Sequence, residues 1–119
     1  MKNKFKPAFL GIKNLLLYDL AIRIHLVIAL VVSAAGWIFG VSSLEWLIII
    51  LCIGIVLVAE AFNSAIEKLC DLTDDHYNTR IKTIKDITAG SVLIAAFISA
   101  VAGIIIFLPK LFRMFGSLF

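Results

Sequence analysis

Three apolar stretches, each close to the length of a membrane-crossing helix, limit what this chain can fold into more than any other feature. They cover about residues 24–39, 46–69 and 87–108. A transmembrane α-helix needs about 20 predominantly apolar residues. Hydrophobic residues make up 62% of the 119 residues and charged residues only 16%, which is too apolar for an ordinary soluble domain. We therefore predict an all-α integral membrane protein with three transmembrane helices, in a single domain spanning residues 1–119.

The segment that precedes the first apolar stretch, about residues 4–19, has a different pattern. Apolar side chains recur there at helical spacing, at Phe5, Phe9, Ile12 and Leu16. Lys6 and Lys13 lie one helical face away, and Pro7 suits the first turn of a helix. This pattern predicts an amphipathic helix that lies on the membrane surface.

The distribution of basic residues predicts the orientation in the membrane. Basic side chains precede the first span, at Lys2, Lys4, Lys6, Lys13 and Arg23, and recur before the third span, at Lys68, Arg80, Lys82 and Lys85. The turn at residues 40–45 has none. By the positive-inside rule, the N-terminus and the loop at residues 70–86 are cytoplasmic. The net charge of +3 is concentrated where lipid headgroups or nucleotide phosphates are met, so it does not indicate nucleic-acid binding.

Polar residues on the second span form the most informative cluster. Glu60, Asn63, Ser64 and Glu67 follow the i, i+3, i+4, i+7 spacing and therefore share one helical face. An acidic group beside such an apolar run is expected to face protein or water rather than lipid. This polar stripe of residues 60, 63, 64 and 67 could hold a cation, although Asn63 also has a simpler interpretation as a polar contact between helices.

Other polar residues near the predicted cytoplasmic loop also have structural interpretations. Asp86 begins the third span and could cap it, while Lys85 could anchor the helix at the headgroups. Asp71 could cap or solvate the end of the second span. His76 is interpreted as a solvated loop residue, and His25 as a polar contact within the bundle.

The motif formed by these residues resembles a known family. The run EAFNSAIEKLCD at residues 60–71 is followed by Lys85-Asp86 and by a helix start rich in small residues at positions 89–96. This arrangement resembles the prokaryotic diacylglycerol kinase pattern E-x-x-N-[ST]-A-I-E-x-x-x-D with a downstream K-D. Gly11-Ile12-Lys13 and Arg23-Ile24-His25 resemble the nucleotide-proximal helix of the Gram-positive-type branch, so the likeness covers about residues 5–107.

The resemblance implies roles for the stripe. Glu60 matches the catalytic glutamate of the family, which takes the proton from a lipid hydroxyl. Asn63 would be hydrogen-bonded to Glu60 or to that hydroxyl, and Ser64 and Arg23 would lie beside the lipid substrate. Glu67 matches the glutamate that binds Mg²⁺, and Asp19 occupies the position where the family usually has a second metal-binding glutamate.

The resemblance also implies a nucleotide site for ATP, made by Lys85, Asp86, Glu67, Tyr77 and Lys13. Lys85 would contact a phosphate and Asp86 an adenine or ribose donor. Tyr77-Asn78 stands where the family has a Tyr-His element, so the role of that histidine is not carried over.

Together these features predict an ATP- and Mg²⁺-dependent lipid kinase at the cytoplasmic face of a bacterial inner membrane. Its acceptor would be undecaprenol or diacylglycerol, and the motif containing His25 favours undecaprenol. The resemblance also implies a homotrimer with sites between subunits. The alternative functions are a small cation- or proton-coupled transporter that uses Glu60, and a structural membrane subunit in which these acids only make contacts between helices.

Overall fold

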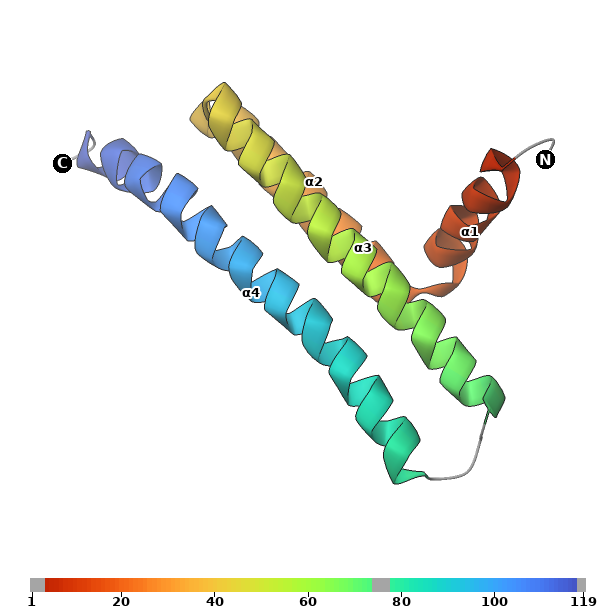
Figure 1. Cartoon of the computed structure of the whole chain (residues 1–119). Coiled ribbons are helices and arrows are strands. Elements are labelled where there is room, and N and C mark those ends of the chain that lie inside the picture. The colour runs from red at the N-terminus through yellow and green to blue at the C-terminus, as the bar shows by residue number, and fades with distance from the viewer. Residues whose placement is uncertain (1–3, 74–77, 118–119) are drawn as a thin grey trace.

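The computed structural model describes residues 4–73 and 78–117. These residues form four helices, which are α1 (Phe5–Tyr18), α2 (Leu20–Phe39), α3 (Ser43–Thr73) and α4 (Thr79–Gly116) (Figure 1). The last three are long and apolar enough to cross a membrane. The predicted all-α fold with three candidate membrane spans is therefore confirmed. Tyr77 and His76 lie outside the described residues.

The first two helices meet at Asp19, earlier than predicted. Asp19 has an extended backbone, with φ −110° and ψ 107°, and its Oδ1 accepts a hydrogen bond from the backbone N–H of Ile22 at 3.2 Å. Asp19 is thus the N-cap of α2, which begins at Leu20 rather than near residue 24. The break lets α1 leave the bundle at an angle (Figure 1).

A tight turn joins α2 to α3. Gly40 ends α2 in the left-handed conformation, with φ 63°, which glycine adopts without strain. Ser42 and Glu45 then cap α3 reciprocally. The Ser42 N–H donates to Glu45 Oε1 at 2.9 Å, and the Glu45 N–H donates to Ser42 Oγ at 3.2 Å. The turn therefore ends before Glu45, and α3 begins at Ser43.

The connection between α3 and α4 is shorter than the predicted loop at residues 70–86. α3 continues to Thr73, and α4 begins at Thr79 with Asn78 as its N-cap. Asn78 Oδ1 accepts from the Arg80 N–H at 2.9 Å. Asp86 therefore lies inside α4, and its interpretation as a cap is wrong. At the other end α4 passes through Pro109 to Gly116, rather than stopping near residue 108.

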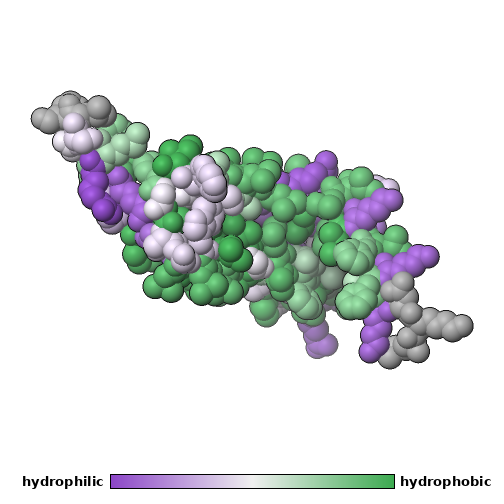
Figure 2. Space-filling view, turned by 90° about the horizontal axis from the view of Figure 1, so that it is seen from above, coloured by the Kyte–Doolittle hydropathy of each residue, from purple (hydrophilic) through white to green (hydrophobic). Residues whose placement is uncertain are grey.

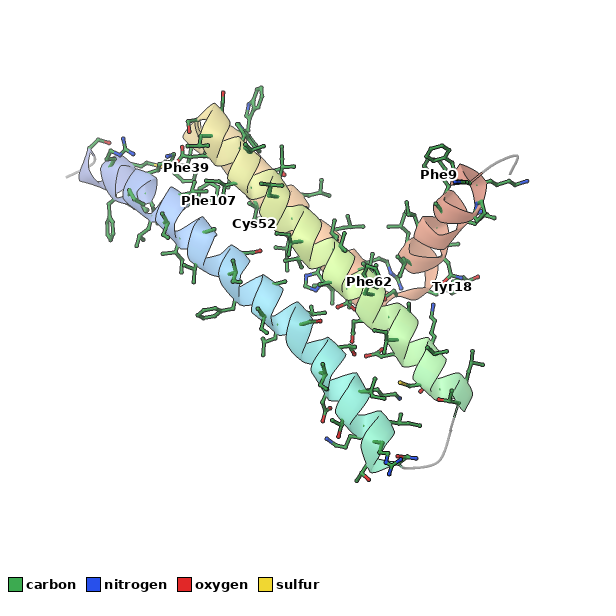
Figure 3. All side chains as sticks on the ribbon, in the orientation of Figure 1. Phe9, Tyr18, Phe39, Cys52, Phe62 and Phe107 are labelled. Carbon is green, nitrogen blue, oxygen red and sulfur yellow. The ribbon has the colours of Figure 1, made fainter. Side chains whose placement is uncertain are left out.

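The bundle has a small core in which α3 packs against both α2 and α4. Val41, Ile49 and Ile106 form the buried cluster, with Trp46 and Phe107 packed against it. Phe107 also meets Phe39 edge to face, with ring centroids 6.0 Å apart (Figure 3). Most other large apolar side chains are exposed, and apolar side chains cover most of the face in Figure 2. Such a surface is suited to lipid or to further subunits.

An ion pair joins α3 to α4 at the end away from the predicted cytoplasmic loop. Lys110 Nζ lies 2.8 Å from Glu45 Oε2 and 2.9 Å from Glu45 Oε1. The two side chains are only 16% and 24% exposed, so the pair is better shielded than an ordinary surface salt bridge. It fastens the last turns of α4, beyond Pro109, to the first turn of α3.

The packing of Gly36 against Trp46 gives a testable prediction for the α2–α3 contact. A Cβ on Gly36 would lie 2.8 Å from Trp46 Cη2, so the ring would have to move. We expect Gly36→Ala to lower the free energy of unfolding by about 1–3 kcal/mol. Thermal unfolding in detergent, followed by circular dichroism, measures this loss. Gly103→Ala is the control because its Cβ would meet nothing within 4 Å. Equal midpoints for the two variants would contradict the packing argument.

Candidate functional site

The polar stripe predicted on the second span is a real structural feature of α3. Glu60, Asn63 and Ser64 are 6%, 8% and 7% exposed, and they are the buried polar side chains of the described residues. Glu67, two turns further on, is exposed. Burial of a carboxylate is costly unless other groups compensate for lost water. The stripe therefore runs from a desolvated acid at Glu60 to a solvated acid at Glu67.

Asn63 lies between the two glutamates and connects them. Its Nδ2 donates a hydrogen bond to Glu67 Oε1 at 3.3 Å, and its side chain also interacts with Glu60. The expected partner was Glu60 or a bound hydroxyl, so the direct bond to Glu67 is an addition to that prediction. Asn63 Oδ1 is buried with no hydrogen-bond partner. A buried carbonyl oxygen of this kind is available to accept a hydrogen bond from another molecule.

The junction of α1 and α2 contributes charged groups beside Glu60. Asp19 and His25 both lie within electrostatic range of the Glu60 carboxylate, as does Glu67. Phe62 and Tyr18, labelled in Figure 3, mark the level of the stripe and the nearby end of α1. The structure thus brings the predicted residues Asp19 and Glu67 to the surroundings of the same buried acid. Among the residues that the structure describes, no group of three His, Cys, Asp or Glu side chains could hold a metal ion.

Lys85 and Asp86 are neighbours in sequence, but they have different partners. Lys85 Nζ lies 2.7 Å from Asp71 Oδ1 on α3, and Glu67 is within electrostatic range of the Lys85 ammonium. Asp86 pairs with Lys82 one turn away on α4, at 2.7 Å. Lys85 is therefore directed to the end of α3, whereas Asp86 is held on its own helix. Asp71 is 66% exposed in the last turns of α3, and in addition to this solvated position it joins α3 to α4.

The other predicted residues lie further from the stripe. Lys13 and Arg23 are exposed, and the described residues contain no hydrogen bond or ion pair that joins either side chain to the stripe. A neighbouring contact does tie α1 to α3, since Lys68 Nζ donates to Asn14 Oδ1 at 3.1 Å. That contact holds one side of α1 against the end of α3. Tyr77 belongs to the part of the chain that is not described.

A cavity lies on the membrane side of these charged groups. It has a volume of about 310 Å³ and is lined by apolar side chains of α2, α3 and α4. Half-buried His25 also lines it and lies within electrostatic range of Glu60. The site therefore combines a buried acid, a solvated acid, a directed lysine and an adjoining apolar space.

Sequence reasoning missed the partnership of Asp71 with Lys85 and that of Asn14 with Lys68. The signal for the first was present, because position 71 continues the helical face of residues 60, 64 and 67. An acid on that face is a natural partner for a base on a packed neighbouring helix. The second contact depends on the direction in which α1 leaves α2, which no local pattern indicates.

Comparison with known proteins adds independent findings. The family model for prokaryotic diacylglycerol kinase matches residues 6–107, which include parts of all four helices. An undecaprenol kinase of Bacillus subtilis is 40% identical over 89 residues, covering 75% of this chain and 72% of that protein. A diacylglycerol kinase of Synechocystis sp. is 28% identical over 111 residues, covering 92% of this chain but only 63% of that protein.

Proposed function

This chain belongs to the prokaryotic diacylglycerol kinase family and is a lipid kinase, and we propose that it transfers the γ-phosphate of ATP to the hydroxyl of a membrane alcohol. The observation that carries this proposal is the polar stripe of α3, where buried Glu60 is followed by exposed Glu67. One end of the stripe suits an acceptor that stays in the membrane. The other suits a donor that comes from water.

Glu60 is the proposed general base. Its burial near an apolar cavity matches a reaction in which the hydroxyl of a lipid arrives from within the bilayer. A base placed beside that hydroxyl removes its proton as the oxygen attacks phosphorus. Asn63, whose side chain interacts with Glu60, is proposed to orient the Glu60 carboxylate toward that hydroxyl. Ser64 and Arg23 are proposed to lie along the path of the lipid.

Glu67 is the proposed protein ligand for Mg²⁺, together with Asp19. Carboxylate oxygens are the ligands this cation prefers, and it usually takes only one or two from the protein. Glu67 is exposed, and its Oε1 accepts the amide of Asn63, which orients the carboxylate. When bound, Mg²⁺ offsets the negative charge of the nucleotide phosphates. Two carboxylates are the kind and number of protein ligands that this ion usually takes, which supports the proposal.

The nucleotide would lie at the exposed end of the stripe. Lys85, directed to α3, is proposed to contact a phosphate, and Asp86 a donor group of the adenine or ribose. Lys13 is proposed to approach from α1, which the contact between Lys68 and Asn14 ties to α3. Tyr77 completes the proposed nucleotide residues.

The assembly and location are also proposals. One chain exposes most of its large apolar side chains and leaves the exposed end of the stripe open to solvent. We propose a homotrimer whose sites lie between subunits, with an amphipathic α1 on the membrane surface. The basic residues before α2 and between the predicted second and third spans support a cytoplasmic site, in a bacterial inner membrane.

The acceptor test compares two lipids. Undecaprenol is the preferred acceptor in our proposal, because the relative at 40% identity is named an undecaprenol kinase and the relative at 28% a diacylglycerol kinase. We expect purified protein in mixed micelles to transfer γ-³²P from ATP to undecaprenol faster than to dioleoylglycerol, and only with Mg²⁺. Faster labelling of dioleoylglycerol would reverse the assignment. Label in neither lipid would favour the transporter hypothesis.

Removing the proposed base gives a second prediction. We expect Glu60→Gln to bind ATP normally but to lose about 10²–10⁴-fold in kcat, because the amide keeps the volume and lacks the basic oxygen. Titration calorimetry and the labelling assay measure the two quantities. Glu45→Gln, on the same helix but in the pair with Lys110, should keep its kcat. Near-normal turnover of Glu60→Gln would remove Glu60 from its proposed role.

Changing the proposed metal ligand gives a third prediction. Glu67→Gln loses the anionic oxygen while keeping a side chain that can still contact Asn63. We expect the Mg²⁺ concentration for half-maximal activity to rise about tenfold or more, as metal-site mutations typically cause. A Mg²⁺ titration of activity at fixed ATP measures the shift, with Glu45→Gln as the control. An unchanged Mg²⁺ requirement would argue against Glu67 as a ligand.

A further inference from the structure

The contact between Asp71 and Lys85 joins the two helices that border the proposed nucleotide site. Asp71 lies in the last turns of α3 and Lys85 in the second turn of α4, and their charged atoms are 2.7 Å apart. The two residues are 14 positions apart, so the contact is not a local helical pair. It is formed because α4 runs back alongside α3 in the opposite direction (Figure 1).

The Asp71–Lys85 ion pair is expected to add little to the stability of the fold. The Lys85 side chain is 39% exposed and the Asp71 side chain 66% exposed. Pairs as exposed as this contribute little to the stability of a fold, because water and salt screen them. The contact nevertheless determines the direction of a long and flexible side chain. The contact therefore fixes where the Lys85 ammonium lies.

The neighbouring charges determine which acidic side chain pairs with Lys85. Asp86 is held by Lys82 on the outer side of α4, at 2.7 Å, and so does not compete for Lys85. The Lys85 ammonium is held against α3 instead, within electrostatic range of Glu67. An ammonium has three N–H donors. With one donated to Asp71, two remain for other acceptors in the space next to Glu67.

We propose that Asp71 is a positioning residue, which holds the Lys85 ammonium beside Glu67 so that the phosphates of ATP meet a cation already in place. This inference rests on the proposed function, because it assigns Asp71 to the same nucleotide site. Asp71 itself does not touch the nucleotide. It lowers the cost of binding by restricting Lys85 before ATP arrives.

The competing explanation is that the Asp71–Lys85 ion pair has only a structural role, which is to hold α3 against α4. The chain offers a matched control for it, since Glu45 and Lys110 join the same two helices at their other ends. A structural joint should affect thermal stability whichever end is broken. A positioning residue should affect ATP binding only when Asp71 is changed.

The experiment measures kcat, the KM for ATP, the KM for the lipid and the thermal midpoint for four proteins, which are the wild type, Asp71→Asn, Asp71→Glu and Glu45→Gln. We expect Asp71→Asn to raise the KM for ATP about tenfold while kcat and the KM for the lipid change less than about twofold, because only the preorganisation of Lys85 is lost. Asp71→Glu keeps the charge and should recover most of the ATP affinity. Glu45→Gln should lower the midpoint and leave the KM for ATP unchanged.

Two results would overturn the inference. One is a KM for ATP in Asp71→Asn that equals the wild-type value, or that changes no more than it does in Glu45→Gln. The other is an Asp71→Glu variant whose KM for ATP is raised as much as that of Asp71→Asn, because a retained carboxylate should still hold the Lys85 ammonium. Absence of ATP-dependent labelling by the wild-type protein would instead overturn the proposed function, so the two failures are distinguishable.

Discussion

The least favourable feature of this structure, in free energy, is the Glu60 carboxylate, which is buried among apolar helices. A carboxylate removed from water must be compensated by nearby polar groups, and the groups around Glu60 come from several parts of the chain. Asn63, on the same helix, and His25, on α2, compensate the charge, whereas Asp19, at the junction where α1 turns away, is a second negative charge that adds to the cost. The same break at Asp19 caps α2 and brings a second acid to the first. The junction of α1 and α2 therefore lies beside a buried acid that a purely structural protein would have little reason to retain.

The sequence predicted the spans better than their ends. Apolar composition marks the part of each helix that lies in lipid, and it gave three helices correctly. It could not mark where the helices end in water, because the lysines and arginines of residues 80–85 are good helix formers and continue α4 outwards. The true signal was Asn78, a favoured N-cap residue, which made the connection short. Likewise the polar stripe followed from spacing within one helix, whereas the pairing of Asp71 with Lys85 depends on the relative placement of two helices.

The exposed surface and the open stripe have a common explanation in the proposed assembly. A single chain buries few of its large apolar residues, and its proposed donor site is bordered mainly by α3 and α4. Lipid can cover the apolar surface, but it cannot enclose the charged end of the stripe. A neighbouring subunit would supply the missing wall there. The comparisons add the reaction class, lipid phosphorylation, which no arrangement of carboxylates in one chain would specify by itself.

Two ion pairs of the described residues join α3 to α4 at opposite ends, and together they constrain the length of both helices between them. Glu45 and Asp71 are 26 residues apart on α3, and their partners Lys110 and Lys85 are 25 residues apart on the antiparallel α4. At about 1.5 Å per residue both spacings are about 38 Å, so the two helices match in length between their fastenings. Adding or deleting one residue between them would turn one of the paired side chains by about 100° around its helix axis. The length of each helix between the two ion pairs is therefore constrained to a fixed number of residues, whereas side chains on the exposed apolar surface between them are not constrained by these contacts.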